Sequence, residues 1–176
     1  MSSVAAIFTS PVKSLALSRS ASVAVGPNGI VEDRRFHLVD AEGRLVTQRQ
    51  QGRLTLVQAG YSAESEALSL QFPDGERVDG ATELGDAVTT VMWGRQVSGR
   101  EAVGPWSEAL SEFCGLLVRL VKSDNPCESF DEYPVSMLSQ ASVDNSRARV
   151  DGGPHLDGSR FRPNSLLHRL LSPTPS

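Results

Sequence analysis

Residues 35–48, RFHLVDAEGRLVTQ, predict a β-hairpin. Phe36 and Leu38 alternate with His37, which is the period of a strand that packs one face on a core. The tetrapeptide DAEG (Asp40–Gly43) has the residues of a short hairpin loop, and RLVTQ then returns along the first strand. We therefore expect short antiparallel strands joined by tight turns to dominate the fold.

Short β-prone segments separated by turn residues continue on both sides of this hairpin. Upstream, VAAIFT (4–9) stops before Pro11, and ASVAV (21–25) is followed by the turn GPNG (26–29). Downstream, the expected strands are RLTLVQA (53–59), ALSLQF (67–72), RVDG (77–80), AVTTVMW (87–93) and QVSGREAV (96–103). Many short strands at regular spacing favour a mainly β fold, as a small barrel or sandwich.

The pattern changes after residue 103. GPWSEALSEFCG (104–115) predicts an amphipathic helix, because a proline lies near its first position and a glycine ends it. LLVRLV (116–121) predicts another strand, and VSMLS (135–139) a short buried strand or turn. SVDNSRARV predicts a weak helix, for which Ser142 is the expected N-cap.

Composition excludes several classes of protein. The chain has 176 residues, 39% of them hydrophobic, and a net charge of −4, which disfavours a general nucleic-acid binder. Its apolar runs are too short to span a bilayer, and the N-terminus lacks the pattern of a signal peptide, so we expect a cytoplasmic protein without membrane contact. Two cysteines outside any C-x-x-C pair and three scattered histidines argue against a structural zinc site.

Four clusters of basic and polar residues lie at predicted strand ends or in loops. They are PVKSL (11–15), EDRRF (32–36), TQRQ (47–50) and SRFRPN (159–164). Together they could line an anion pocket, because arginine makes two-point contacts to phosphate, lysine supplies a point charge and serine a neutral hydrogen bond. Alternatively, each cluster is a set of solvated surface charges, and spacing alone leaves both interpretations open.

The remaining reactive side chains have weaker claims to a role in chemistry. Cys127 lies in an acidic loop, where neighbouring negative charge raises a thiol pKa, and Cys114 is expected to fill space in the core. His37 is expected on the surface or the barrel wall. Trp93 and Trp106 are expected in the core. The sequence also lacks the G-x-S-x-G, P-loop and H-E-x-x-H patterns.

Four stretches in order resemble the MOSC family. They are SPVKSL (10–15), GIVEDRRFHLVDAEGRLVTQRQQGRL (29–54), FDEYPVSMLSQASVDN (130–145) and SRFRPN (159–164). Members of this family are similar to the C-terminal domain of molybdenum cofactor sulfurase and to the mitochondrial amidoxime-reducing components. The resemblance covers residues 4–164, and it implies a MOSC N-terminal β-barrel over residues 1–120 followed by the beginning of a second β-barrel, the MOSC domain, over residues 121–164.

The resemblance also implies a cofactor, the molybdenum-carrying pterin called molybdopterin. The positions that match family motifs, and so become candidate cofactor-binding residues, are Lys13, Ser14, Arg34, Ser139, Arg162 and Asn164. Lys13 and Arg34 would take the pterin phosphate, and Ser139 and Asn164 the polar edge of the pterin. Pyridoxal phosphate belongs to the other half of the sulfurase proteins and is not expected here.

The implied activity is oxidoreduction of N-oxygenated compounds, with an electron-transfer domain or protein as partner, or sulfur transfer. One departure from the family pattern opens an alternative. After Asn164 the family continues with an apolar strand and later the cysteine that binds molybdenum, whereas here SLLHRLLSPTPS (165–176) follows. We expect this tail to be disordered, and the chain to be a truncated, non-catalytic remnant or ligand-binding module if the cysteine is missing.

Overall fold

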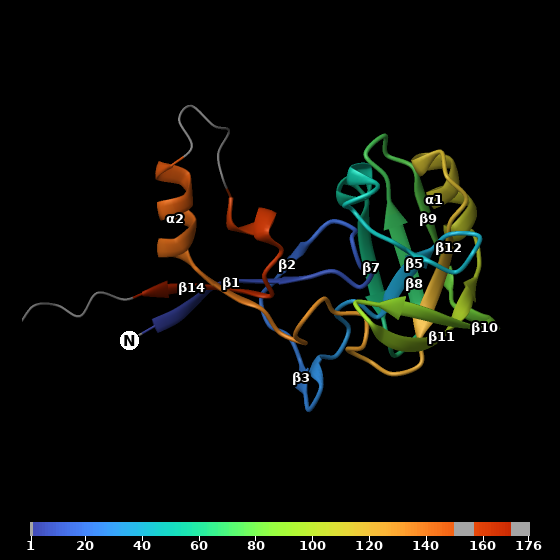
Figure 1. Ribbon diagram of the computed structural model, residues 1–176, viewed down its shortest axis with the longest axis horizontal. Helices are drawn as coiled ribbons and strands as arrows, with labels where there is room; N and C mark the ends of the chain where they lie inside the picture. Colours follow the sequence, from blue (N-terminus) through green and yellow to red (C-terminus); the bar gives the residue numbers. More distant parts are fainter. Residues whose placement is uncertain (1, 150–156, 170–176) are drawn as a thin grey trace, which may run out of the picture.

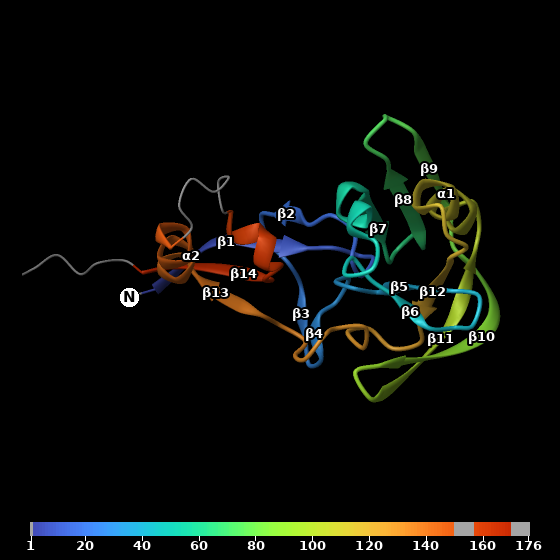
Figure 2. The ribbon, with the colours of Figure 1, turned by 45° about the horizontal axis from the view of Figure 1, so that its top comes forward.

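The computed structural model describes residues 2–149 and 157–169, and most of its regular structure is β-strand, as the sequence predicts (Figure 1). The strands form two lobes. One lobe contains the larger core and helix α1, and the other contains the two ends of the described chain and helix α2 (Figure 2).

Two sheets and one helix enclose the larger core. The five-stranded sheet has the order β10 (Glu83–Met92), β11 (Arg95–Val103), β12 (Arg119–Ser123), β5 (Phe36–Val39) and β6 (Leu45–Val46). The three-stranded sheet has the order β7 (Gln58–Ser62), β8 (Ala67–Gln71) and β9 (Arg77–Ala81). All neighbouring strands in both sheets are antiparallel. The hairpin predicted from residues 35–48 is therefore confirmed as β5 and β6.

Helix α1 (Trp106–Cys114) completes this lobe. Trp106 is fully buried in the core with Leu110, one turn further along the same helix face. The indole Nε1 of Trp106 donates a hydrogen bond to the carbonyl oxygen of Leu68, 3.1 Å away, so its polar group is satisfied inside the core. Gly115 ends the helix, as the sequence predicts, and its backbone is in the left-handed conformation.

The second lobe joins segments from both ends of the described chain. Its sheet has the order β13 (Met137–Ser139), β14 (Ser165–Arg169), β1 (Ser2–Thr9) and β2 (Ser18–Ser20). Helix α2 (Gln140–Ala148) packs on this sheet through Val143, which contacts Ala6 and Leu166 in a small separate core. The short hairpin β3 (Val25–Gly26) and β4 (Gly29–Ile30) and the 3-10 turn η2 (Gly158–Phe161) complete the described elements.

Two expected strands are wrong. Within residues 53–59 the chain first forms the 3-10 turn η1 (Gly52–Leu56), and β7 begins only at Gln58. The buried pair there is Leu54 and Val57, three residues apart, and Leu56 is exposed, so the burial period is that of a 3-10 turn and not of a strand. Similarly, residues 21–24 are irregular and lie between β2 and β3.

The segment after Asn164 also differs from the expectation of a disordered tail. Residues 165–169 form β14, which pairs in parallel with β13 and antiparallel with β1. The adjacent residues Leu166 and Leu167 break the alternation of apolar and polar residues, which explains why SLLHR gave no strand signal. Residues 170–176 lie outside the described residues.

The division of the chain at residue 120 stays a prediction. In space the lobes do not follow chain order, because β1 and β2 share a sheet with β13 and β14. Strand β12 spans residue 120 and belongs to the five-stranded sheet. In the part of the chain that the structure describes, no helix has the length and apolar character needed to cross a membrane.

Candidate functional site

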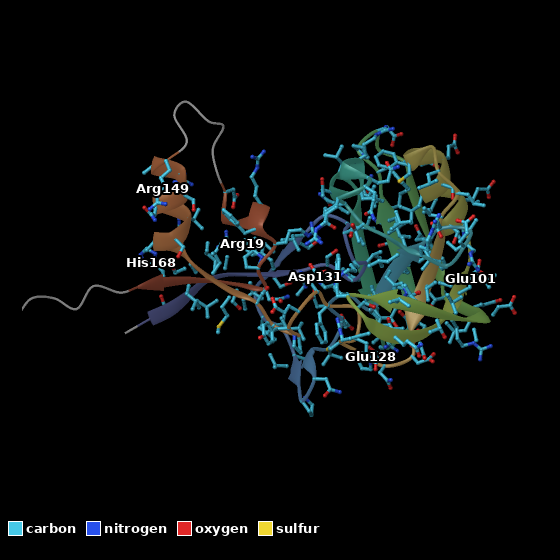
Figure 3. The ribbon with its side chains drawn as sticks, in the orientation of Figure 1. Arg19, Glu101, Glu128, Asp131, Arg149 and His168 are labelled. Carbon is cyan, nitrogen blue, oxygen red and sulfur yellow. The ribbon has the colours of Figure 1, made fainter. Side chains whose placement is uncertain are left out.

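All four basic-polar clusters meet at one pocket of about 520 Å³. The clusters contribute to its lining Lys13, Ser14, Arg34, Gln48, Arg49, Arg160, Arg162 and Asn164. Residues 130–137 close another side, and Asp131 among them lies between the two lobes (Figure 3). The sequence alone left the convergence of these loops open, and the structure brings them together.

Lys13 is the most deeply buried cation of the pocket, with only 5% of its side chain exposed. Its ammonium donates hydrogen bonds to the Ser129 carbonyl oxygen at 2.9 Å and to the Asp131 carboxylate at 2.5 Å. Burial lowers the pKa of Lys13, and the bond and charge of Asp131 only partly counteract this. A buried ammonium of this kind is stabilised by any anion that reaches it.

Asp33 organises the residues around Arg34. Its buried carboxylate accepts hydrogen bonds from the Ser10 backbone N–H at 2.8 Å and from the Asn164 amide at 2.9 Å, and it is ion-paired with Arg34. The Asn164 side-chain oxygen accepts from the backbone N–H of Ser136 at 3.0 Å. One carboxylate thus ties together three segments that are far apart in the sequence.

Arg162 faces the same pocket and is held by backbone oxygen atoms. Its guanidinium donates to the Leu15 carbonyl at 2.6 Å, and its own carbonyl accepts from the guanidinium of Arg34 at 3.3 Å. Burial and the nearby charge of Arg34 lower the pKa of Arg162 to about 10. Arg162 therefore stays charged at neutral pH, although burial and the neighbouring Arg34 charge disfavour its charged form.

Three of the pocket residues have left-handed backbone conformations that side chains other than glycine rarely adopt. The φ angles are 76° at Ser14, 50° at Arg34 and 54° at Arg162. Such conformations cost free energy and tend to gather at functional sites. In addition, the buried hydroxyl of Ser14 has no hydrogen-bond partner within the described residues. The pocket therefore contains a polar group that a ligand could satisfy.

Of the six candidate residues from the sequence, five line this pocket and Ser139 does not. Ser139 is the N-cap of α2, and its hydroxyl accepts a hydrogen bond from the Ser142 backbone N–H at 3.0 Å. The sequence-based assignment of the cap to Ser142 is thus wrong by three residues. The predicted cofactor role of Ser139 has no support from its position.

Replacing Ser139 with alanine should separate the two roles. Loss of the cap should lower the free energy of unfolding by about 1 kcal/mol and leave ligand binding at the pocket unchanged. Urea unfolding and a binding titration on the same preparation measure both quantities. Ser142→Ala is the control, because within the described residues its hydroxyl contacts that of Ser139, and the backbone bond that caps the helix would survive. A drop in ligand affinity with Ser139→Ala would return Ser139 to the site.

Sequence reasoning missed Asp131 and Trp93 as residues of the site region. The Trp93 indole, predicted in the core, is half exposed; its Nε1 donates to the Asp131 carboxylate at 3.1 Å, and the Arg49 guanidinium stacks on its ring at 4.8 Å. The FDEYP stretch belongs to a family motif, but nothing in the sequence marks its aspartate as a partner of Lys13, which is 118 residues away.

The two cysteines lie outside the pocket. Cys127 is buried and its thiol donates to the Ile30 carbonyl at 3.1 Å; burial and the charge of Asp33 raise its pKa. Burial likewise raises the pKa of Cys114, which packs against the larger core as predicted. Neither environment favours a reactive thiolate. Within residues 2–149 and 157–169 there is no group of three or more His, Cys, Asp or Glu side chains suited to a metal ion.

Comparison with known proteins supplies a family for this arrangement. Residues 1–116 match the family described as MOSC N-terminal beta barrel domain. A molybdenum cofactor sulfurase from Danio rerio is 29% identical over 131 residues, an alignment that covers 66% of this chain and 15% of that protein. A solution structure of a Bordetella bronchiseptica protein is similar with 16% identity and a TM-score of 0.43, over 65% of this chain and 97% of that one. The chain thus spans only a small part of the sulfurase.

Proposed function

The chain belongs to the family of proteins with a MOSC N-terminal β-barrel domain, and on this premise we propose that its pocket binds the phosphate-bearing pterin of the molybdenum cofactor. The observation that carries the proposal is the convergence of five cationic side chains on one pocket. They are Lys13, Arg34, Arg49, Arg160 and Arg162. The matched sulfurase is named for the same cofactor, which is the second support.

The residues of the pocket fit the anionic part of this ligand. Lys13 offers a point charge at the buried end, and Arg34 and Arg162 offer planar donors beside it. The hydroxyl of Ser14, which has no partner within the described residues, would supply a neutral hydrogen bond. The lowered pKa values of Lys13 and Arg162 indicate that the folded protein holds positive charge there at a cost, and a bound phosphate would offset that cost.

When bound, the cofactor would supply a molybdenum centre for electron transfer or for carrying sulfur. The residues of this chain would bind and orient its phosphate, and Asn164 would be close to the same ligand. Oxidoreduction and sulfur transfer both require that molybdenum is bound together with the pterin, whereas a ligand-binding module does not. Elemental analysis separates these roles: molybdenum in equal amount to pterin supports the first two, and pterin without metal supports a ligand-binding module.

Lys13→Met tests the binding proposal. The substitution keeps the aliphatic stem that packs in the core and removes the ammonium. A hydrogen bond between charged groups contributes about 1.5–3 kcal/mol, so the affinity for the pterin should fall roughly 10- to 100-fold, and the pterin retained through purification should fall with it. Protein from a cofactor-producing host would be denatured and oxidised, and the released pterin measured by fluorescence.

Arg44→Ala is a matched control for this test. It also removes one positive charge, but its side chain is 74% exposed and does not line the pocket. Because Asp131 is half exposed, it can be solvated after Lys13 is replaced, so we expect Lys13→Met to fold. Equal pterin content in the wild type and Lys13→Met, with both proteins folded by circular dichroism, would reject the proposal.

A further inference from the structure

Asp131 occupies the contact with Lys13 that an incoming anion needs. Its carboxylate accepts hydrogen bonds from the Lys13 ammonium at 2.5 Å and from the Trp93 indole at 3.1 Å. The side chain of Asp131 is 55% exposed, and that of Lys13 only 5%. The carboxylate therefore lies on the solvent side of a buried cation, where a ligand from solution would meet it first.

The backbone that carries Asp131 is held independently of this ion pair. The Arg95 guanidinium donates to the carbonyl oxygen atoms of Phe130 at 2.8 Å and Asp131 at 3.2 Å. It also lies 4.2 Å from the centre of the Phe130 ring. Because these contacts involve the main chain and the preceding ring, the Asp131 side chain can rotate away from Lys13 while its loop stays in place.

We infer that the Asp131 carboxylate is an intramolecular competitor in the pocket. Every anionic ligand must displace it from the Lys13 ammonium. The inference rests on the proposed anion-binding function and adds to it a residue that lowers the affinity of the pocket for every anion. Displacing Asp131 costs the same free energy for any ligand. A singly charged anion only replaces one negative charge with another, and it must compete with a carboxylate whose effective concentration is high.

A doubly charged phosphate gains more binding free energy at this pocket than a singly charged anion does. It brings a second charge and further oxygen atoms, which Arg34 and Arg162 are placed to bind beside Lys13. Asp131 thus lowers the affinity of both kinds of anion by one factor, and the further contacts of a phosphate keep it bound at concentrations at which a monoanion is not. Glu132 also lines the pocket, but the described residues give it no ion pair, so it does not occupy Lys13.

Phenyl phosphate and benzoate are matched probes for this inference, because they share a ring and differ in charge at pH 7.5. Calorimetric titrations would compare the wild type with Asp131→Asn and Glu132→Gln, two variants with the same net charge. In Asp131→Asn, the affinity for both probes should rise about tenfold or more, by a similar factor for each. In Glu132→Gln, only long-range repulsion is relieved, so the rise should stay below about threefold and be larger for the dianion.

Trp93 reports the displacement directly. Phosphate binding should remove the carboxylate from the Trp93 indole and change its emission, whereas Trp106 is fully buried and should not respond. Trp93→Phe should abolish the signal. These are the two tryptophans of the chain, so the assignment is unambiguous.

Three results would count against the inference. Equal effects of Asp131→Asn and Glu132→Gln would show that Asp131 acts only as a nearby charge. Phosphate binding without a change in Trp93 emission would show that the carboxylate never leaves. Both results would leave the proposed function intact, provided that Lys13→Met weakens phosphate binding. If no variant and no wild-type protein binds phenyl phosphate, the inference and the proposed function both fail.

Discussion

Asp33→Ala should destabilise the protein by about 3–5 kcal/mol and abolish phosphate binding at the pocket. Only 3% of the Asp33 side chain is exposed, and its partners are the Arg34 guanidinium, the Asn164 amide and the backbone N–H of Ser10. Removing one member of a buried ion pair leaves the other charge without compensation, which is among the costliest of single substitutions. The buried N–H of Ser10 would also lose its acceptor.

Urea unfolding measures the loss of stability, and phenyl phosphate titration at low temperature measures binding by the folded fraction. Glu32→Ala is the control, because Glu32 is the exposed neighbour and its only hydrogen bond in the described residues is to the Ala63 N–H at 3.2 Å. We expect that variant to lose less than about 1 kcal/mol. If Asp33→Ala also loses less than about 1 kcal/mol, the hydrogen bonds and ion pair of Asp33 do not hold the pocket together.

Most strands of the larger lobe were predictable because alternation and turn residues within each short segment specify them. Alternation in residues 67–72 and the PDGE turn after it specify β8 and the hairpin to β9, and Leu68 and Leu70 are fully buried as that alternation requires. The wrong strand prediction at residues 53–59 lies where buried residues recur every three positions instead of every two. Leu54 in the 3-10 turn η1 and Val57 directly after it are buried three residues apart, inside a segment that has the composition of a strand.

The candidate site was predictable in its cations and not in its carboxylates. Lys13, Arg34 and Arg162 stand out because charged residues cluster at strand ends. Asp33 and Asp131 look like ordinary surface acids in the sequence, since the partners that define them are supplied by other segments. Contacts between residues more than 100 positions apart depend on how the two lobes meet, and one sequence carries no direct signal of that.

The left-handed conformations were also beyond the reach of sequence patterns. Glycine marks such positions in most turns, but Ser14, Arg34 and Arg162 adopt them with full side chains. All three residues line the pocket, and a left-handed conformation costs local free energy. The rule that glycine marks left-handed positions fails at these three residues. Such departures from local preference are expected at functional sites.

His37 should make the protein steeply less stable in mild acid. Its ring is fully buried in β5, with Nε2 3.0 Å from the Thr90 hydroxyl and Nδ1 3.2 Å from the Ser129 hydroxyl. Burial, and then the charge of Lys13, lower its pKa from 6.5 to about 3. Because the unfolded chain takes up the proton first as the pH falls, stability should be lost between pH 6.5 and 3, at up to about 1.4 kcal/mol per pH unit.

Urea unfolding at intervals from pH 7 to pH 4.5 isolates this effect. Carboxylates such as Asp131 and Glu66 have lowered pKa values, below 3.8 and 4.5 respectively, so their contributions are lost mainly in stronger acid. His37→Gln keeps a neutral hydrogen-bonding side chain and removes the titration. Its stability should be lower than that of the wild type at pH 7 by roughly 1–3 kcal/mol, because the hydroxyl partners are less well satisfied. Between pH 6.5 and 4.5 its stability should change far less than that of the wild type, so the two curves should converge. Parallel curves would mean that the folded protein accommodates a charged His37, and that the buried hydroxyls around it reorganise to solvate an imidazolium.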